Sequence, residues 1–202
     1  MNYTVSSLSE FINIVFLLSS NSTSMLYRGQ SNAEWEVTSS AYRALVNYPC
    51  TPKVLCNYHK QLIESATLLH DSELKGLYGL SLLVHLQHRG AKTMLIDYTR
   101  NPLVALWFAC MDTSQHGQNC DGIVYILDEG NGYNTHITEL ECEKPINDLF
   151  NEDVEIVYKL TPPNLNRRIL AQQSTFLLST LGKIESYRHL SSILVIKDDK
   201  KE

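Results

Sequence analysis

The sequence contains no stretch long and apolar enough to form a membrane helix. A helix that crosses a bilayer needs roughly 18 or more apolar residues in a row. The best candidate, Phe11–Leu18, is much shorter and includes Asn13. The basic start of a secretory signal is also missing. These absences predict a cytoplasmic protein that makes no contact with a membrane.

Cysteine is scarce and irregularly spaced. The five cysteines, an odd number, stand at positions 50, 56, 110, 120 and 142 without a C-x-x-C pair. A disulfide framework favours an even set, and a zinc site needs closer pairing of Cys and His. The pattern therefore predicts reduced thiols and no bound metal.

The 202 residues suit one large domain, and 44% of them are hydrophobic, which is enough for a substantial core. Charge is segregated along the chain. Residues 128–155 hold nine acids and one lysine, whereas residues 156–202 hold eight bases and four acids. The acidic insert (128–155) repels nucleic acid and the basic C-terminal part attracts it, unless both are simply solvated surfaces.

Hydrophobic periodicity and cap signals predict an α+β fold. Helices dominate the first half and strands the second, which favours a single domain (1–202) with mixed or antiparallel sheets over a doubly wound parallel sheet. An N-terminal helix (7–19) precedes a core (25–180) that carries the motifs. The other helices are expected at 54–70, 77–87, 103–111 and 161–171, and the strands at 25–29, 93–97, 122–127, 154–160, 176–180 and 193–197.

The tetrapeptide Tyr27-Arg28-Gly29-Gln30 ends a predicted strand. Arginine binds phosphate or carboxylate with two parallel hydrogen bonds, and glycine lets a ligand approach the backbone closely. The segment is a candidate anion site. The alternative is an Arg–acid pair at a strand end.

A second candidate region runs from His88 to Asn101. His88, at a helix terminus, could act as a general base or cap its own helix. Asp97 and Thr99 precede Asn101, which looks like a helix N-cap, and a helix start can bind an anion. The competing interpretation is that Asp97 pairs with an arginine such as Arg43 to fix the core.

Gln172 belongs to a run, Arg167 to Gln173, that is predicted to end a short helix before a strand. Carboxamides at such a place can read a base or a nicotinamide amide by paired hydrogen bonds. Surface glutamines at a helix end are the alternative.

These segments together resemble the FRG domain family, named for a Phe-Arg-Gly motif. Tyr27 stands at the position of the family Phe, and the match continues through most of the chain. The resemblance lies in Tyr27–Gln30 with Trp35, Ser40 and Arg43, in Gln87–Ala109, in Asp121–Tyr125 and in Arg168–Phe176.

The order of the segments is also similar to that of the ADP-ribosyltransferase fold. That resemblance implies an early Arg that holds NAD, a hydroxyl motif in the middle and a Glu or Gln at a late strand. On this comparison Arg28, Thr99 and Gln172 take these three roles. We further expect His88 or Asp97 to take a proton from the acceptor, so the catalytic candidates are His88, Asp97 and Gln172. The residues that bind the cofactor are Tyr27, Arg28, Gly29, Gln30, Thr99, Asn101 and Arg168.

The leading hypothesis is a cytoplasmic, NAD-dependent ADP-ribosyltransferase that acts as a bacterial toxin or phage-defence effector. The basic C-terminal part favours a nucleic-acid acceptor, RNA first, over a protein acceptor. The acidic insert suits a basic antitoxin or regulatory partner. Two alternatives stay open: a non-catalytic sensor of nucleotides or nucleic acid, and a metal-free nuclease built on His88 and Asp97.

Overall fold

The computed structural model describes residues 2–20, 22, 24–45, 47–49, 51–69, 74–111, 120–130, 137–141, 146–149, 156–161, 171–185, 189 and 191–197. Helices accompany an eight-stranded mixed sheet with the strand order β1-β8-β4-β2-β3-β7-β6-β5. The predicted α+β class is therefore confirmed. The chain divides into two compact units: Met1–Glu36, Tyr98–His136 and Glu185–Glu202 form the first, and Val37–Asp97 and Ile137–Ile184 the second.

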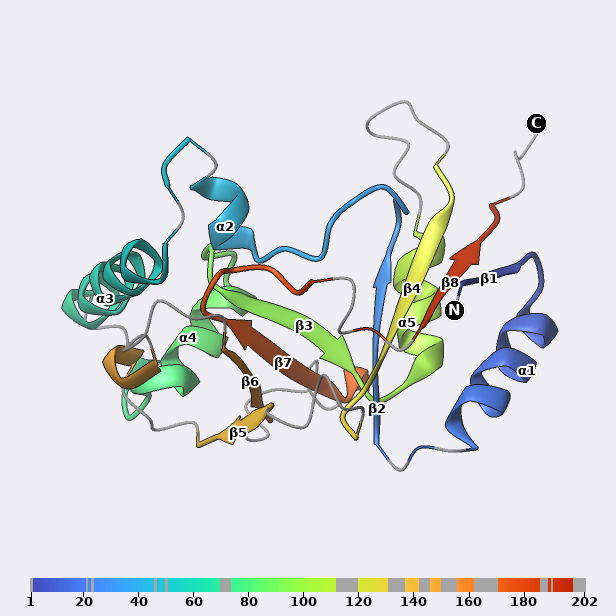
Figure 1. Cartoon of the computed structure of the whole chain (residues 1–202). Coiled ribbons are helices and arrows are strands. Elements are labelled where there is room, and N and C mark those ends of the chain that lie inside the picture. The colour runs from blue at the N-terminus through green and yellow to red at the C-terminus, as the bar shows by residue number, and fades with distance from the viewer. Residues whose placement is uncertain are drawn as a thin grey trace. The chain divides into compact units, whose positions relative to one another are not determined.

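The first unit is built on antiparallel pairs. Strand β4 pairs with β2 on one side and with β8 on the other, and β1 adds to β8 in parallel (Figure 1). The end of β3 joins β2 through the pair Tyr27 and Thr99. The elements of this unit are β1 (Asn2–Val5), α1 (Leu8–Ser19), β2 (Met25–Gln30), the end of β3 (Leu95–Thr99), α5 (Pro102–Cys110), β4 (Gly122–Asp128) and β8 (Ser191–Val195).

Helices α1 and α5 cover one face of these strands. Helix α1 begins at a capping box in which the Ser7 hydroxyl accepts from the Glu10 amide and the Glu10 carboxylate accepts from the Ser7 amide. The buried cluster beneath the two helices gathers apolar residues from alternate positions of three strands. Its members include Phe11, Met25, Tyr27, Ala105, Ala109, Val124, Ile126, Ile193 and Val195.

Two glycines let α5 approach the sheet closely. A Cβ on Gly29 would clash with the carbonyl oxygen of Ala105 and lie 2.9 Å from the backbone nitrogen of Ala109. A Cβ on Gly122, in the neighbouring strand, would clash with the Ala109 carbonyl. The obstacles are backbone atoms, which cannot rotate away as a side chain can. The glycine that follows Arg28 in β2 is thus required by the packing of this helix.

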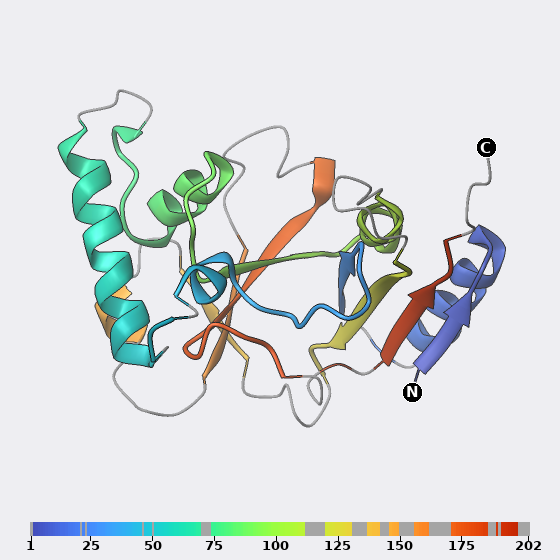
Figure 2. The same ribbon diagram turned by 90° about the horizontal axis from the view of Figure 1, so that it is seen from above.

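The second unit has its own core. Apolar residues of α4, β3, β6 and β7 meet in it, and Phe176 and Leu160 are fully buried. Figure 2 shows α3 and α4 side by side. Helix α4 ends where Gly90 takes a φ of 93°, a left-handed conformation that suits glycine. The elements are α2 (Ser40–Ala44), α3 (Pro52–Leu68), α4 (Gly79–His88), β5 (Thr138–Leu140), the 3₁₀ helix η3 (Ile146–Leu149), β6 (Val157–Leu160) and β7 (Ser174–Ser179).

Several element predictions need correction. The strand predicted at 93–97 is β3 at Leu95–Thr99, so Tyr98 and Thr99 belong to the strand and do not follow it. Helix α5 was predicted to be buried, yet Leu103 is 50% and Trp107 59% exposed, because only the alanine side of the helix faces the sheet. Strand β1, helix α2 and strand β5 were missed. Most of the helix predicted at 161–171 lies outside the described residues.

Among the described residues, no helix combines the length and the apolar content needed to cross a bilayer.

A fully buried histidine ties α3 to the start of β3. The Nδ1 atom of His59 lies 2.6 Å from the Leu55 carbonyl oxygen, and its Nε2 accepts a hydrogen bond of 2.9 Å from the Met94 amide. The ring must therefore carry its proton on Nδ1 and stay neutral. Burial lowers its pKa from 6.5 to about 4, although the bond to Leu55 opposes the shift.

We expect this histidine to make the protein sensitive to acid. The unfolded ring takes up a proton at a higher pH than the folded ring. The contribution of His59 to the free energy of unfolding is therefore complete above pH 6.5 and is lost as the pH falls towards 4. The loss amounts to about 3 kcal/mol at most. NMR should show that the His59 ring stays neutral at pH 5.5, and a ring half-protonated near pH 6.5 would contradict this expectation.

Candidate functional site

The predicted site residues fall into both units. Six of them belong to the first unit: Tyr27, Arg28, Gly29, Gln30, Thr99 and Asn101. Three belong to the second: His88, Asp97 and Gln172. Arg168 lies outside the described residues. The residues of each unit are therefore treated separately.

Alternation along β2 separates the predicted residues of this strand. Tyr27 is buried among the apolar residues under α5, and the missing Cβ of Gly29 points at the same helix. Successive side chains of a strand point to opposite faces. Arg28 and Gln30 therefore project from the other face of the sheet, away from α5. The close approach at Gly29 is made by a helix, which accounts for the glycine without a ligand.

Two neighbouring strands place a tyrosine beside Arg28. In the β2–β4 pair, Arg28 lies opposite Tyr125. In the β2–β3 pair, Tyr27 lies opposite Thr99, so the next residue on each strand is Arg28 and Tyr98. Residues directly opposite in an antiparallel pair share a face of the sheet. The guanidinium is therefore flanked by two phenols.

Gln30 orients Arg28 and connects it to the loop after β2. The Nε of Arg28 donates to Gln30 Oε1 at 3.1 Å, and Gln30 Nε2 donates to the carbonyl oxygen of Trp35 at 2.8 Å. The hydroxyl of Tyr125 donates to the same carbonyl at 3.4 Å. Gln30 is only 6% exposed. The peptide after Trp35 is thus held from two strands.

His189 completes the group. Its Nε2 lies 2.8 Å from the hydroxyl of Tyr98, and the two rings are nearly parallel, with centroids 6.3 Å apart. The ring of Tyr125 lies 4.8 Å from that of His189. We name this set the Arg28 cluster: Arg28, Gln30, Trp35, Tyr98, Tyr125 and His189. Every member belongs to the first unit.

Both phenols of the Arg28 cluster stay protonated at neutral pH. Burial raises the pKa of Tyr98, which is 2% exposed, and the charge of Arg28 only partly opposes this. Burial likewise raises the pKa of Tyr125. The charge of Arg28 lowers this pKa, and the carboxylate of Glu36 raises it. Each hydroxyl therefore remains a hydrogen-bond donor beside a permanent cation. Such a set suits an anionic ligand that also carries an aromatic ring or a sugar.

The residues from Thr99 to Asn101, between the end of β3 and the start of α5, make hydrogen bonds to one another and to α5. The hydroxyl of Thr99 accepts from the Asn101 amide at 3.0 Å, and the Asn101 side chain caps α5 by accepting from the Leu103 amide at 3.0 Å. The predicted cap and the Pro102 at the first helical position are confirmed. A phosphate at this helix start would have to replace these bonds, so the predicted anion site there stays a prediction.

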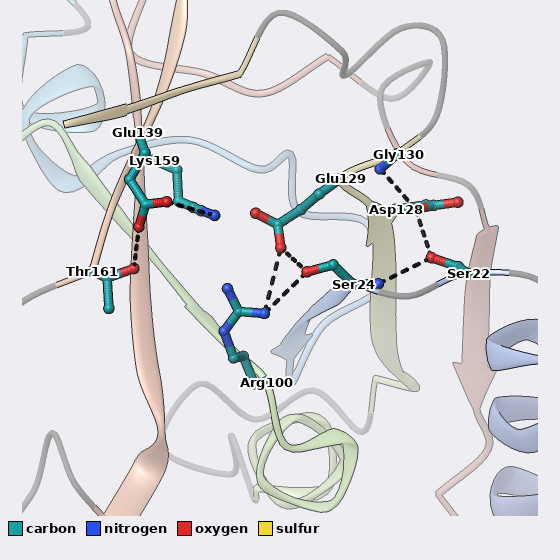
Figure 3. Close-up of polar contacts among 9 residues, drawn as sticks. All are labelled: Ser22, Ser24, Arg100, Asp128, Glu129, Gly130, Glu139, Lys159 and Thr161. Atoms are coloured by element: carbon teal, nitrogen blue, oxygen red, sulfur yellow. Dashed lines mark hydrogen bonds and ion pairs between the residues drawn. The ribbon is translucent and has the colours of Figure 1, made fainter.

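Arg100, which lies between the end of β3 and the start of α5, makes an ion pair within the first unit. Its Nη1 lies 3.4 Å from a carboxylate oxygen of Glu129 and 3.1 Å from the hydroxyl of Ser24, which also donates to Glu129 (Figure 3). The neighbouring acid, Asp128, accepts from the Ser22 hydroxyl at 2.7 Å. The first two acids of the acidic insert therefore have contacts within their own unit.

A third acid of the insert is paired within the second unit. Glu139 lies 3.3 Å from the Lys159 ammonium and accepts from the hydroxyl of Thr161 at 3.0 Å (Figure 3). The carboxylate is largely exposed, so this pair adds little to stability. Of these three acids, Glu129 and Glu139 are paired with a cation of their own unit, and Asp128 accepts from neutral donors.

Two predicted residues of the second unit, Asp97 and His88, have contacts within that unit. Asp97 is exposed and accepts from the Gln87 amide at 3.1 and 3.2 Å, while Gln87 also accepts from the hydroxyl of Thr93. The ring of His88 meets that of Phe176 edge-on, with centroids 6.2 Å apart.

The alternative of an Asp97–Arg43 pair stays a prediction. Arg43 donates to the Thr38 carbonyl at 2.6 Å. Gln172 lies just before Gln173, whose φ of 47° is a left-handed conformation that costs energy for a residue other than glycine. The catalytic roles of His88, Asp97 and Gln172 stay predictions.

Sequence reasoning missed half of the Arg28 cluster. Tyr98 was placed in a loop because the strand was predicted two residues early, and Tyr125 was noted only as part of a motif. The pairing of β2 with β3 and β4 brings Tyr98 and Tyr125 next to Arg28, and a single sequence does not reveal which strands pair. His189 stands in no motif, and nothing in the sequence identifies it.

Among the described residues, no three or more His, Cys, Asp or Glu side chains lie close enough together to hold a metal ion.

Comparison with protein families gives one match. Residues 23–118 match the family model described as the FRG domain. This range contains β2, α5 and four members of the Arg28 cluster: Arg28, Gln30, Trp35 and Tyr98. Searches of curated proteins and of solved structures found no match to the chain.

Proposed function

Because the chain carries an FRG domain in residues 23–118, whose Arg-Gly motif supplies Arg28, we propose that the Arg28 cluster binds NAD for ADP-ribosyl transfer to a macromolecule. One observation carries the proposal: a half-buried guanidinium lies between two phenols that remain protonated. The cation suits the pyrophosphate, and the partly exposed ring of Tyr125 suits a ribose or a base.

The proposed reaction exchanges one bond at the ribose for another. The bond between C1′ of the ribose and the nicotinamide nitrogen breaks, and its electron pair leaves with nicotinamide. A nucleophilic oxygen or nitrogen of the acceptor bonds to C1′ and loses its proton to a base or to water. Positioning of the dinucleotide supplies much of the rate. His88, Asp97 and Gln172 remain the catalytic candidates predicted from the sequence, and no metal is required.

The second candidate function is a sensor that binds a nucleotide or nucleic acid without chemistry. One observation favours it: position 172 holds glutamine. A carboxamide offers no negative charge to the cationic ribose that forms as nicotinamide leaves. Such a sensor would use the same Arg28 cluster and would leave NAD intact.

Calorimetric titration of the purified chain tests the proposed ligand. We expect NAD and ADP-ribose to bind, and inorganic phosphate alone to bind far more weakly, because it reaches the guanidinium but has no ring for the tyrosines. Equal affinity for phosphate and NAD would show that the cluster is only an anion contact. Absence of binding by every nucleotide tested would refute the proposed function.

We further propose that the protein acts in the cytoplasm as a toxin or phage-defence effector, with RNA as the favoured acceptor and an antitoxin as its partner. Expression of the wild-type chain alone should then stop bacterial growth and lower cellular NAD. A chain with Arg28→Ala should permit growth at the same expression level. Unrestricted growth and unchanged NAD with the wild-type chain would favour the sensor.

A further inference from the structure

An acidic side chain lies next to the Arg28 cluster. The peptide that joins Trp35 to Glu36 is held by two hydrogen bonds to its carbonyl oxygen, at 2.8 Å from Gln30 and at 3.4 Å from Tyr125. These donors come from two strands, so the chain at Glu36 has a fixed position although its side chain is exposed.

The carboxylate of Glu36 acts on the phenol that faces Arg28. It raises the pKa of Tyr125, whereas Arg28 lowers it. Both charges are therefore close enough to Tyr125 to influence the same hydroxyl. The pairing of strands β2 and β4 independently places Arg28 opposite Tyr125. A cation and an exposed carboxylate thus both lie near one neutral phenol.

A dinucleotide offers groups for both charges. Its pyrophosphate is anionic and suits arginine, and each ribose presents two neighbouring hydroxyls that donate well to a carboxylate. A phosphate on the ribose 2′-oxygen would instead be repelled by the carboxylate. Arg28 and Glu36 together therefore offer one partner for a phosphate group and one for a ribose diol.

We propose that Glu36 is the residue that recognises a ribose diol in the ligand of the Arg28 cluster and that it excludes ligands with a 2′-phosphate. This proposal rests on the proposed function, because it assigns the ligand class of the same site. It predicts that the protein selects NAD over NADP. Glu36 is a specificity residue here and takes no part in bond breaking.

The test compares the dissociation constants of NAD and NADP for the wild type and for Glu36→Gln. The wild type should prefer NAD by about tenfold or more, since a hydrogen bond to a charged group contributes at least that factor. Glu36→Gln should bind NAD about tenfold more weakly and lose the preference. Glu36→Asp keeps the charge and should still reject NADP.

Two controls localise the effect. Glu34→Gln changes another exposed carboxylate of the same loop, whose backbone amide is already bonded to Asn32, and should leave both constants unchanged. In a Trp107→Phe background, Trp35 is the remaining tryptophan, so a change in its fluorescence on NAD addition places the ligand at the cluster.

The outcomes separate the two proposals. If wild type and Glu36→Gln bind NAD equally and keep the same preference, the role of Glu36 is refuted while the proposed function stands. A wild type that binds NADP as tightly as NAD also refutes it. If the wild type binds neither dinucleotide, both proposals fall.

Discussion

Replacing Gly29 by alanine is expected to lower the thermal unfolding temperature by on the order of 10 °C or to prevent folding. The new methyl group would clash with the Ala105 carbonyl oxygen and lie 2.8 Å from its carbon. Helix α5 would have to move away from β2, which would open the apolar cluster beneath it. Overpacking a core costs about 1–3 kcal/mol when side chains can adjust, and more against backbone.

Gly130→Ala is the matched control for this substitution. Gly130 also belongs to the first unit, but its new methyl group would meet only the Asp128 side chain, at an ordinary 3.4 Å. Its unfolding temperature should stay near that of the wild type. A Gly29→Ala protein as stable as Gly130→Ala would contradict the close packing of α5 on the strands.

Replacing Arg28 by alanine is expected to weaken NAD binding by about 100-fold while the fold persists. The guanidinium is the cation flanked by Tyr98 and Tyr125, and both phenols are neutral at physiological pH. Removing it deletes the charge that holds the pyrophosphate. The substitution also removes the hydrogen bond from Arg28 to Gln30 Oε1, which should lower the free energy of unfolding by only about 1 kcal/mol. Calorimetry and thermal unfolding measure the two effects separately.

Arg100→Ala serves as the control for loss of an arginine. Arg100 belongs to the same unit, its side chain is 42% exposed, and its guanidinium pairs with Glu129 at 3.4 Å. Its removal should leave NAD affinity unchanged. If both arginine variants lost affinity for NAD equally, the ligand would be attracted by the overall positive charge of the unit and not by the Arg28 cluster. Wild-type affinity in Arg28→Ala would remove the cluster from the binding site.

Local signals in the sequence predicted much of the secondary structure. Ser7 and Glu10 identified the start of α1, and Asn101 with Pro102 identified that of α5, because caps depend on side chains within one turn. The burial of α5 was wrong because its apolar residues surround the whole helix, and only packing decides that Ala105 and Ala109 face the sheet.

The candidate site was harder to predict because it depends on strand pairing. Arg28 was identified from its motif, but its neighbours Tyr125 and Tyr98 come from strands that pair with β2 across about 70 to 100 residues of sequence. Gly29 was assigned to ligand approach, and the helix carbonyl that it accommodates cannot be seen without the fold. The sequence indicated a chemically special segment but not which groups surround it.

Incubation of the purified protein with NAD labelled in its adenylate half, together with total RNA, DNA and cell protein, tests the central claim most directly. We predict that label enters one macromolecular fraction, RNA first, with one nicotinamide released for each ADP-ribose transferred, and that Arg28→Ala abolishes both. Intact NAD and unlabelled fractions, from a protein that nevertheless binds NAD, would contradict the transferase and identify the domain as a nucleotide sensor.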